Sequence, residues 1–154
     1  MTASIEEDRA ALLDLLCRDG IYWSTPTQPI VTHDGSAARW MLDSLRVSLT
    51  PRGAELAARC LMERLARFDA VQIATYGLTA IPLLQACVMR SEGRYRGLII
   101  RKEKKGHGSL KLIEGPIDRD QPIVLIDDSI SSGLSIMRGL EIAEAAGLRV
   151  LGGV

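Results

Sequence analysis

One stretch constrains the fold more than any other: residues 122–133, which read Pro-Ile-Val-Leu-Ile-Asp-Asp-Ser-Ile-Ser-Ser-Gly. Residues 123–126 are a short continuous apolar run, typical of a parallel strand that is buried on both faces. A loop of small residues follows, and a helical pattern begins at Leu134. This order of strand, loop and helix predicts one unit of an α/β sheet, with the loop at the carboxyl end of its strand.

Two carboxylates, Asp127 and Asp128, stand at the end of this predicted strand. Successive side chains of a strand point to opposite faces, so the two acids cannot have the same role. The loop after them, residues 129–133, leaves backbone N–H groups free at a helix N-terminus, where the dipole favours an anion. A ribose 5-phosphate would satisfy both halves, with hydroxyls for the acids and a phosphate for the amides. The alternative is an ordinary strand end followed by an N-capped turn. The order of acids, loop and helix favours the sugar phosphate.

The same residues carry a resemblance to a known family. Residues 124–133 resemble the phosphoribosyl-pyrophosphate (PRPP) motif of type I phosphoribosyltransferases. Residues 101–108, Arg-Lys-Glu-Lys-Lys-Gly-His-Gly, and 111–115, Lys-Leu-Ile-Glu-Gly, resemble the mobile loop of orotate phosphoribosyltransferases. The two motifs come in the order of that family, and the resemblance covers roughly residues 20–154.

The composition is that of one globular domain with no global charge. The chain has 154 residues, with 19 Lys and Arg against 19 Asp and Glu, so nothing general favours a nucleic-acid or membrane partner. The sequence contains no apolar run of transmembrane length and no signal-peptide pattern, which predicts a cytoplasmic protein. The three cysteines are widely spaced in apolar patterns and are expected to be free thiols.

Along the sequence, predicted helices and predicted strands alternate. Residues 4–7, Ser-Ile-Glu-Glu, form a capping box that starts a helix ending at Gly20. Residues 30–33 and 39–42 are expected to form a hairpin outside the main sheet. Further predicted elements are a helix from Thr50-Pro51, strands at 71–74, 97–101, 123–126 and 148–154, and helices at 80–90 and 134–146. The pattern predicts an α/β domain in which helices flank a parallel sheet. The resemblance implies a single type I phosphoribosyltransferase-like domain, with an N-terminal helix and hood in 1–45 and a PRPP-binding core in 50–154.

Three loops are expected to meet at the carboxyl ends of the strands: residues 75–79, 102–114 and 129–133. The middle loop is strongly basic and holds two glycines, Gly106 and Gly108, which suit a lid. A solvated charged loop or a nucleic-acid patch are the alternatives. A nucleic-acid patch would need interleaved aromatic residues and a wider basic surface, and the sequence shows neither.

The resemblance implies a reaction, and a role for each loop. It implies Mg2+-dependent transfer of ribose 5-phosphate from PRPP to a nitrogenous base, orotate in the family, with release of pyrophosphate by a homodimer. The implied PRPP-binding residues are Arg101, Lys102, Lys105, His107, Asp127, Asp128, Ser129, Ile130, Ser131, Ser132, Gly133, Leu134 and Ser135. Among them Lys105, His107 and Asp128 are the implied catalytic set, and Tyr76, Gly77, Leu78 and Thr79 form the implied pyrophosphate loop. No direct protein ligand of Mg2+ is implied, because the acids act on the waters of an ion that PRPP carries.

Two departures from the family pattern concern the base. Ala37 stands where the resemblance places a lysine that helps to hold orotate. The family also has, beyond its last strand, an Asp-Arg segment whose arginine binds the orotate carboxylate, and this sequence ends at Val154 before that point. These departures leave open three alternatives: a fragment of a longer chain, a different base, or a non-catalytic PRPP- or nucleotide-sensing module on the same fold. The lost base contacts favour the sensor. Lys105 and His107 favour the enzyme, because a sensor needs no pyrophosphate lid.

Overall fold

The expected alternation of strands and helices is present in the computed structural model, which describes residues 4–32, 35–103 and 112–154. Five strands form one sheet in the order β7-β6-β5-β8-β9. Their bounds are β5 Gln72–Tyr76, β6 Arg96–Ile100, β7 Ile113–Glu114, β8 Ile123–Ile126 and β9 Val150–Gly153. The pairs β5–β6, β5–β8 and β8–β9 are parallel, so these strands have their carboxyl ends at one edge of the sheet.

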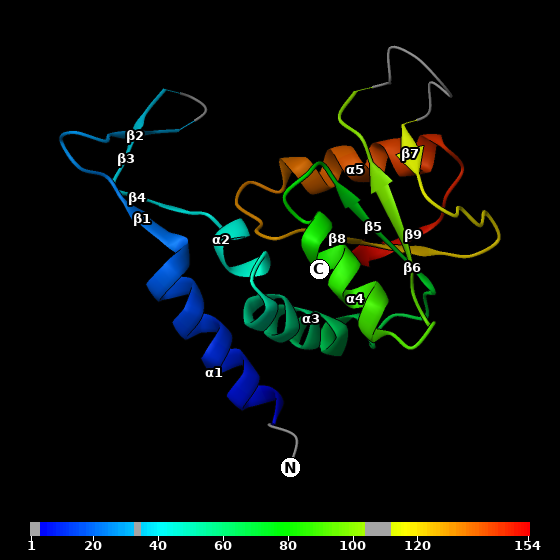
Figure 1. Cartoon of the computed structure of the whole chain (residues 1–154). Coiled ribbons are helices and arrows are strands. Elements are labelled where there is room, and N and C mark those ends of the chain that lie inside the picture. The colour runs from blue at the N-terminus through cyan, green and yellow to red at the C-terminus, as the bar shows by residue number, and fades with distance from the viewer. Residues whose placement is uncertain (1–3, 33–34, 104–111) are drawn as a thin grey trace.

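Helices cover both faces of this sheet (Figure 1). Helices α3 (Pro51–Leu65) and α4 (Ile81–Arg90) lie on one face, and α5 (Leu134–Ala145) lies on the other. The side chains of β8 alternate between the two cores: Val124 and Ile126 pack with α3 and α4, whereas Ile123 and Leu125 pack with α5. All four are buried, which explains why this strand reads as an unbroken apolar run.

The sheet is parallel, as predicted, except at one edge. Strand β7 pairs antiparallel with β6, with Ile113 opposite Ile100 and Glu114 opposite Ile99. These residues had been assigned to the loop 102–114. A strand of two residues is too short to show an alternating pattern, so only its pairing with β6 reveals it.

Local signals placed most helix ends correctly. The Ser4 Oγ accepts the Glu7 N–H at 3.2 Å, and the Glu7 carboxylate accepts the Ser4 N–H at 2.7 Å, so the capping box is complete. Helix α1 (Ile5–Leu15) continues as a π-helical turn, η1 (Leu16–Gly20), and ends at the expected glycine. Gly147 follows α5 with a φ of 79°, the left-handed conformation that favours glycine after a helix.

The N-terminal hood consists of two small sheets outside the main sheet (Figure 1). Strand β1 (Ile21–Trp23) pairs with β4 (Trp40–Leu42), and β2 (Ile30–Val31) pairs with β3 (Ala37–Ala38), both antiparallel. Extra β-structure was therefore predicted correctly, but the expected pairing of 30–33 with 39–42 was wrong. Ladders of two or three residues with little buried surface carry a weak register signal in the sequence.

Charged contacts attach α1 to α3. The Asp8 carboxylate is 1% exposed and lies 2.6 Å from the Arg59 Nε. Beside this pair, Arg9 donates to the Glu63 carboxylate at 2.9 Å. No local pattern around Asp8 indicates its burial, because its partner Arg59 belongs to α3, far along the chain. Removing Arg59 would leave a buried charge without compensation, the change that most damages a buried ion pair.

A short helix that the sequence analysis missed, α2 (Leu45–Ser48), connects the hood to the core. It lies so close to the first turn of α3 that a Cβ atom at Gly53 would stand 2.0 Å from the Val47 carbonyl oxygen. The first turn of α3 is itself capped, since Thr50 Oγ1 accepts the Gly53 N–H at 3.1 Å. Helix α2 is therefore fixed on the core rather than on the hood.

The cysteines are free thiols, as expected: Cys17 is exposed, Cys60 half-buried and Cys87 buried. Burial raises the pKa of the Cys87 thiol to about 12. None of the helices in the described part of the chain is both long enough and apolar enough to span a membrane.

Candidate active site

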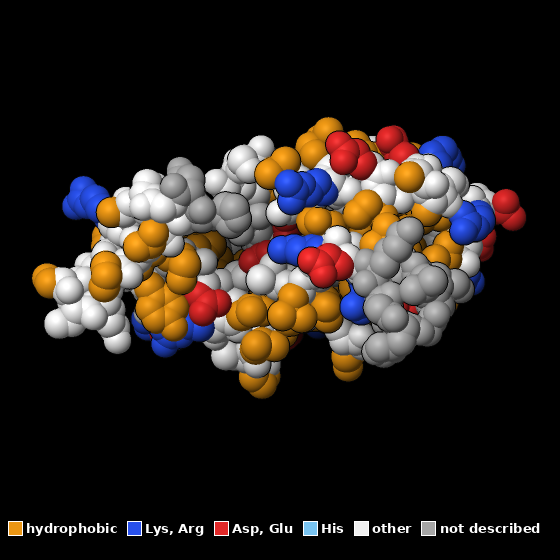
Figure 2. Space-filling view, turned by 90° about the horizontal axis from the view of Figure 1, so that it is seen from above, with side chains coloured by type: hydrophobic (Ala, Val, Ile, Leu, Met, Phe, Trp, Pro, Cys, Tyr) orange, Lys and Arg blue, Asp and Glu red, His pale blue; other side chains and the backbone are white. Residues whose placement is uncertain are grey.

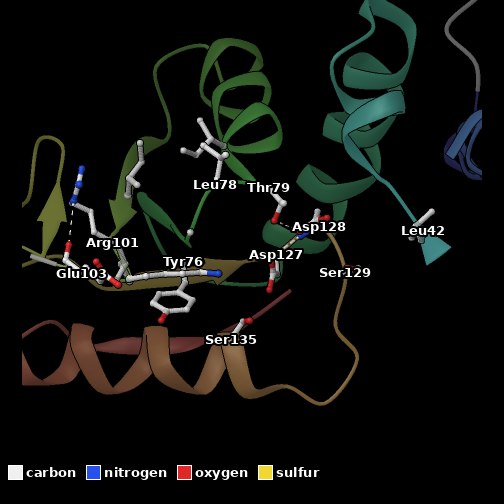
Figure 3. Close-up of a pocket in the computed structure, with 15 residues that line it drawn as sticks. Leu42, Tyr76, Leu78, Thr79, Arg101, Glu103, Asp127, Asp128, Ser129 and Ser135 are labelled. Carbon is white, nitrogen blue, oxygen red and sulfur yellow. Dashed lines mark hydrogen bonds between the residues drawn. The ribbon is translucent and has the colours of Figure 1, made fainter. Parts of the chain in front are cut away.

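The carboxyl ends of β5, β6 and β8 surround a cavity of about 650 Å³ (Figure 3). Each of the three predicted loops contributes to it, and one hood residue lies at its side. The lining residues are Leu42, Tyr76, Gly77, Leu78, Thr79, Ile81, Ile99, Ile100, Arg101, Lys102, Glu103, Asp127, Asp128, Ser129 and Ser135. The fold thus brings together groups that lie far apart in the sequence.

Two predicted catalytic residues, Lys105 and His107, lie outside the described residues. The residues on either side of the undescribed segment are neighbours, because the Arg101 N–H donates to the Leu112 carbonyl at 2.8 Å. Arg101 and Lys102, at the start of the connection from β6 to β7, line the cavity as expected of pyrophosphate-binding cations.

Asp128 is held by hydroxyl groups from two other elements. Thr79, in the loop after β5, donates to Asp128 Oδ1 at 2.8 Å (Figure 3). Ser44, the residue before α2, donates to the other carboxylate oxygen, Oδ2. The sequence analysis placed Thr79 in the site but missed Ser44. No local pattern marks Ser44, which precedes Asp128 by 84 positions.

The carboxyl group of Asp127 has a raised pKa. Burial, and then the hydrogen bond with the neighbouring Asp128 side chain, raise the pKa of Asp127 from 3.8 to about 6. The Asp128 N–H, which donates to Asp127 Oδ1 at 3.0 Å, and the charge of Lys102 act in the opposite direction. The two acids therefore differ in surroundings, as the alternation of side chains along a strand predicts.

The raised pKa of Asp127 predicts that Asp127→Asn stabilises the ligand-free fold at neutral pH. The folded state holds the proton more tightly than the unfolded state, so stability falls as pH rises from about 4 to above 6. A shift of this size corresponds to at most about 3 kcal/mol, and the half-exposed position of the carboxyl reduces the expected gain to about 1 kcal/mol at pH 7.

Chemical denaturation of both proteins across pH 3 to 8 measures this effect. The free energies of unfolding should coincide near pH 3, diverge between about pH 4 and 6, and stay parallel above that range. A constant difference at every pH would contradict an effect of ionisation.

The loop after Asp128 forms a cup beside the main cavity. A hollow of about 230 Å³ is lined by Asp127, Ser129, Ile130, Ser131, Ser132, Gly133, Leu134, Ser135 and Ile136, which include every residue predicted to bind the 5-phosphate. Gly133 precedes α5 with a φ of 76°, and nothing lies within 4 Å of a Cβ built on it, so its conformation rather than crowding requires glycine. The first N–H groups of α5 have no intrahelical acceptor, which suits an anion here.

The loop after β5 is shaped by Gly77, whose φ is 91°. The Gly77 N–H donates to the Ile100 carbonyl at 3.0 Å, which connects this loop to the end of β6. A Cβ at Gly77 would come within 3.1 Å of the Lys102 Cε, and the Lys102 ammonium lies 5.9 Å from the centre of the Tyr76 ring. Lys102 therefore lies along the loop predicted to bind pyrophosphate.

Several known proteins are similar to this chain in sequence. No protein-family model matches the chain. The orotate phosphoribosyltransferase of Thermosynechococcus vestitus is 34% identical over 151 residues, covering 96% of this chain and 77% of that protein. That of Nostoc sp. is 33% identical over 150 residues, covering 95% and 70%. That of Rhodopirellula baltica is 35% identical over 125 residues, covering 75% and 65%.

Solved structures agree with these relatives. The chain matches Mycobacterium tuberculosis orotate phosphoribosyltransferase with a TM-score of 0.79 and 27% identity, covering 95% of this chain and 81% of that one. It matches a Corynebacterium diphtheriae phosphoribosyltransferase with a TM-score of 0.80 and 25% identity, covering 96% and 80%. The fold is that of the type I phosphoribosyltransferases, as predicted.

Within that class the relatives identify the family. The chain belongs to the orotate phosphoribosyltransferase family, which confirms the family inferred from the two sequence motifs. It spans 65% of the length of the Rhodopirellula protein and 77% of that from Thermosynechococcus.

Proposed function

We propose that the chain transfers ribose 5-phosphate from PRPP to a pyrimidine-like base, orotate in the named relatives, and releases pyrophosphate. One observation carries this proposal: Asp127 lines both the 650 Å³ cavity and the hollow at the start of α5, and Asp128 lines the cavity beside it. That arrangement offers acceptors for ribose hydroxyls beside donors for a phosphate. The names of the relatives support a transferase of pyrimidine synthesis over a non-catalytic sensor.

In the proposed reaction the acids, the loop before α5 and the basic residues each bind a different part of PRPP. The carboxylates of Asp127 and Asp128 accept hydrogen bonds from the ribose hydroxyls, and the amides of residues 129–135 bind the 5-phosphate. Arg101 and Lys102 supply positive charge where pyrophosphate leaves, together with Lys105 and His107 of the same connection. Cations aimed at charge that grows in the transition state are usually the largest catalytic contribution.

The site fits a magnesium ion that arrives with PRPP. Mg2+ is usually held by one or two carboxylates and substrate phosphates while it keeps several waters. The carboxylates of Asp127 and Asp128 would accept hydrogen bonds from the waters of such an ion, and the described residues contain no group of three or more His, Cys, Asp or Glu that could hold a metal alone. When bound, the ion would neutralise the diphosphate.

We propose that the protein acts as a homodimer, as the family resemblance implies. The exposed hood surface supports an interface: Trp23 is 65% exposed and Trp40 is 54% exposed, and the two are paired across β1 and β4. Figure 2 shows hydrophobic side chains gathered on the hood, at the left of the view. Exposed apolar patches of this kind commonly mark protein–protein contacts.

Binding of PRPP with Mg2+ is expected to raise the melting temperature of the protein. A ligand at a hundred times its Kd adds about 2.7 kcal/mol to the free energy of unfolding. Thermal unfolding with millimolar PRPP and Mg2+ measures this, and release of pyrophosphate with orotate or uracil then tests turnover. Uracil belongs in the assay because Ala37, at the expected lysine position, lies in β3 and outside the cavity lining. No melting shift in wild type would refute the proposal, and the shift should shrink in Asp128→Asn.

A further inference from the structure

The hydroxyl of Ser44 is used in an unusual way. Ser44 stands at the N-cap position of α2, where serine normally accepts an N–H of its own helix. Here it makes no such cap. The Ser44 Oγ donates to Asp128 Oδ2 instead. The N–H groups that a serine cap would accept are bonded to backbone carbonyls, Arg46 N–H to Asp43 at 3.3 Å and Val47 N–H to Ser44 at 3.0 Å. The Ser44 hydroxyl therefore remains available for the carboxylate across the site.

The position of Ser44 is fixed by backbone hydrogen bonds, by burial and by the packing of α2 against α3. Its carbonyl accepts the Val47 N–H at 3.0 Å and the Ser48 N–H at 2.8 Å, and the residue is 9% exposed. Helix α2 in turn contacts α3 so closely that Gly53 leaves no room for a Cβ against Val47. A hydroxyl on such a support has a fixed position relative to the sheet, which a side chain on a free loop would lack.

The bond from Ser44 restricts how Asp128 can turn. Thr79 donates to one carboxylate oxygen and Ser44 to the other, so the carboxylate plane is fixed from two sides. An ionised carboxylate has about four lone-pair positions, so further acceptor positions stay available to a ligand. Thr79 is exposed, whereas Ser44 is buried, so the serine is the less adaptable of the two donors.

We propose that Ser44 is a positioning residue, which acts through Asp128 to orient its carboxylate for the ribose hydroxyls of PRPP. This inference rests on the proposed function. It also connects the hood to the site, because Ser44 is the second residue after β4, and Leu42 at the end of β4 lines the cavity. The junction is anchored by the Asp43 N–H, which donates to the Gly20 carbonyl at 2.8 Å.

The test compares Ser44→Ala with a matched control, Ser48→Ala. Ser48 belongs to the same short helix, is 5% exposed, and its hydroxyl contacts no hydrogen-bond partner among the described residues. The probes are ribose 5-phosphate and inorganic phosphate, measured by calorimetry, with melting temperatures as a check on folding. Ser44→Ala is expected to weaken ribose 5-phosphate roughly tenfold, the effect of losing one hydrogen bond to a charged group, and to leave inorganic phosphate unchanged.

A double-mutant cycle with Asp128→Asn shows whether the two residues act together. If Ser44 works through Asp128, Ser44→Ala adds little in the Asp128→Asn background. Three outcomes would overturn the inference: equal affinities for Ser44→Ala and Ser48→Ala, an equal loss for both probes, or additive losses in the double mutant. Failure of wild type to bind ribose 5-phosphate would instead contradict the proposed function, which keeps the two failures distinct.

Discussion

Asp128→Asn is expected to lower kcat/KM for PRPP roughly tenfold to a hundredfold, because a hydrogen bond to a charged group contributes about 1.5–3 kcal/mol and the carboxylate is proposed to accept ribose hydroxyls. The amide also disturbs the existing contacts. Ser44 and Thr79 both donate to Asp128, one to each oxygen. An amide offers one acceptor and one donor, so one of these hydroxyls would meet an N–H group.

The matched control is Asp120→Asn, an exposed acid that is not among the residues lining the cavity. Its activity should stay within twofold of wild type, since substitutions on the surface, away from the cavity and from buried contacts, have small effects, about 0.5 kcal/mol. Initial rates at varied PRPP give kcat and KM separately. An Asp128→Asn protein that keeps more than a tenth of the wild-type kcat/KM would show that this carboxylate does not hold the ribose.

The pH profile adds an independent check on Asp128. The side chain of Asp128 raises the pKa of Asp127 through its hydrogen bond and its charge. Removing that charge should move the pKa of Asp127 back toward its ordinary value, although burial still raises it. The loss of ribose 5-phosphate binding on acidification should therefore occur at lower pH in Asp128→Asn than in wild type.

Features that the sequence predicted well depend on local chemistry. The strand at 123–126 was placed with its observed bounds because all four side chains are buried. The starts of α1 and α3 were found from the capping hydroxyls of Ser4 and Thr50, which act within three residues. The end of α5 was found from Gly147, whose left-handed conformation is a property of that residue.

Features that the sequence did not reveal depend on contacts between distant residues. The antiparallel edge strand β7 exists because β6 offers a partner, and the hood pairings depend on strands of two or three residues. Asp8 reads as one more acid in a charged first turn, and only its contact with Arg59 explains its burial. Asp127, Asp128 and Thr79, which line the cavity, were singled out through motifs, whereas Ser44, which donates to Asp128, belongs to no motif.

The acidic pair at the end of β8 shows how one local pattern gives two chemical roles. Asp128 receives donors on both oxygens, whereas Asp127 is half-buried and has a raised pKa. The site therefore has one acceptor whose two oxygens are both held by hydroxyl groups, and a second, Asp127, that loses its charge on mild acidification. A perturbed pKa of this kind is typical of functional sites.

Mixing two inactive variants is expected to restore activity if the basic connection of one subunit serves the site of the other. Lys105→Ala alone should lose roughly a hundredfold or more in rate, because the leaving pyrophosphate would lose the cation that the family resemblance makes the main catalytic one. Asp128→Asn alone should lose roughly tenfold to a hundredfold. In a mixed dimer with sites shared between subunits, one site carries both substitutions and the other carries neither. Random pairing makes about half of the dimers mixed, so activity should return to roughly a quarter of wild type.

The control for this experiment is Lys104→Ala, which removes a neighbouring positive charge of the same connection outside the predicted catalytic set. It should retain most of the wild-type rate, which separates the role of Lys105 from the general charge of the segment. Subunit exchange in the mixture is verified with differently tagged chains before activity is measured. If each connection serves its own subunit, every site in every dimer keeps one lesion. Activity that stays at the level of the single variants in an exchanged sample would therefore exclude a shared site.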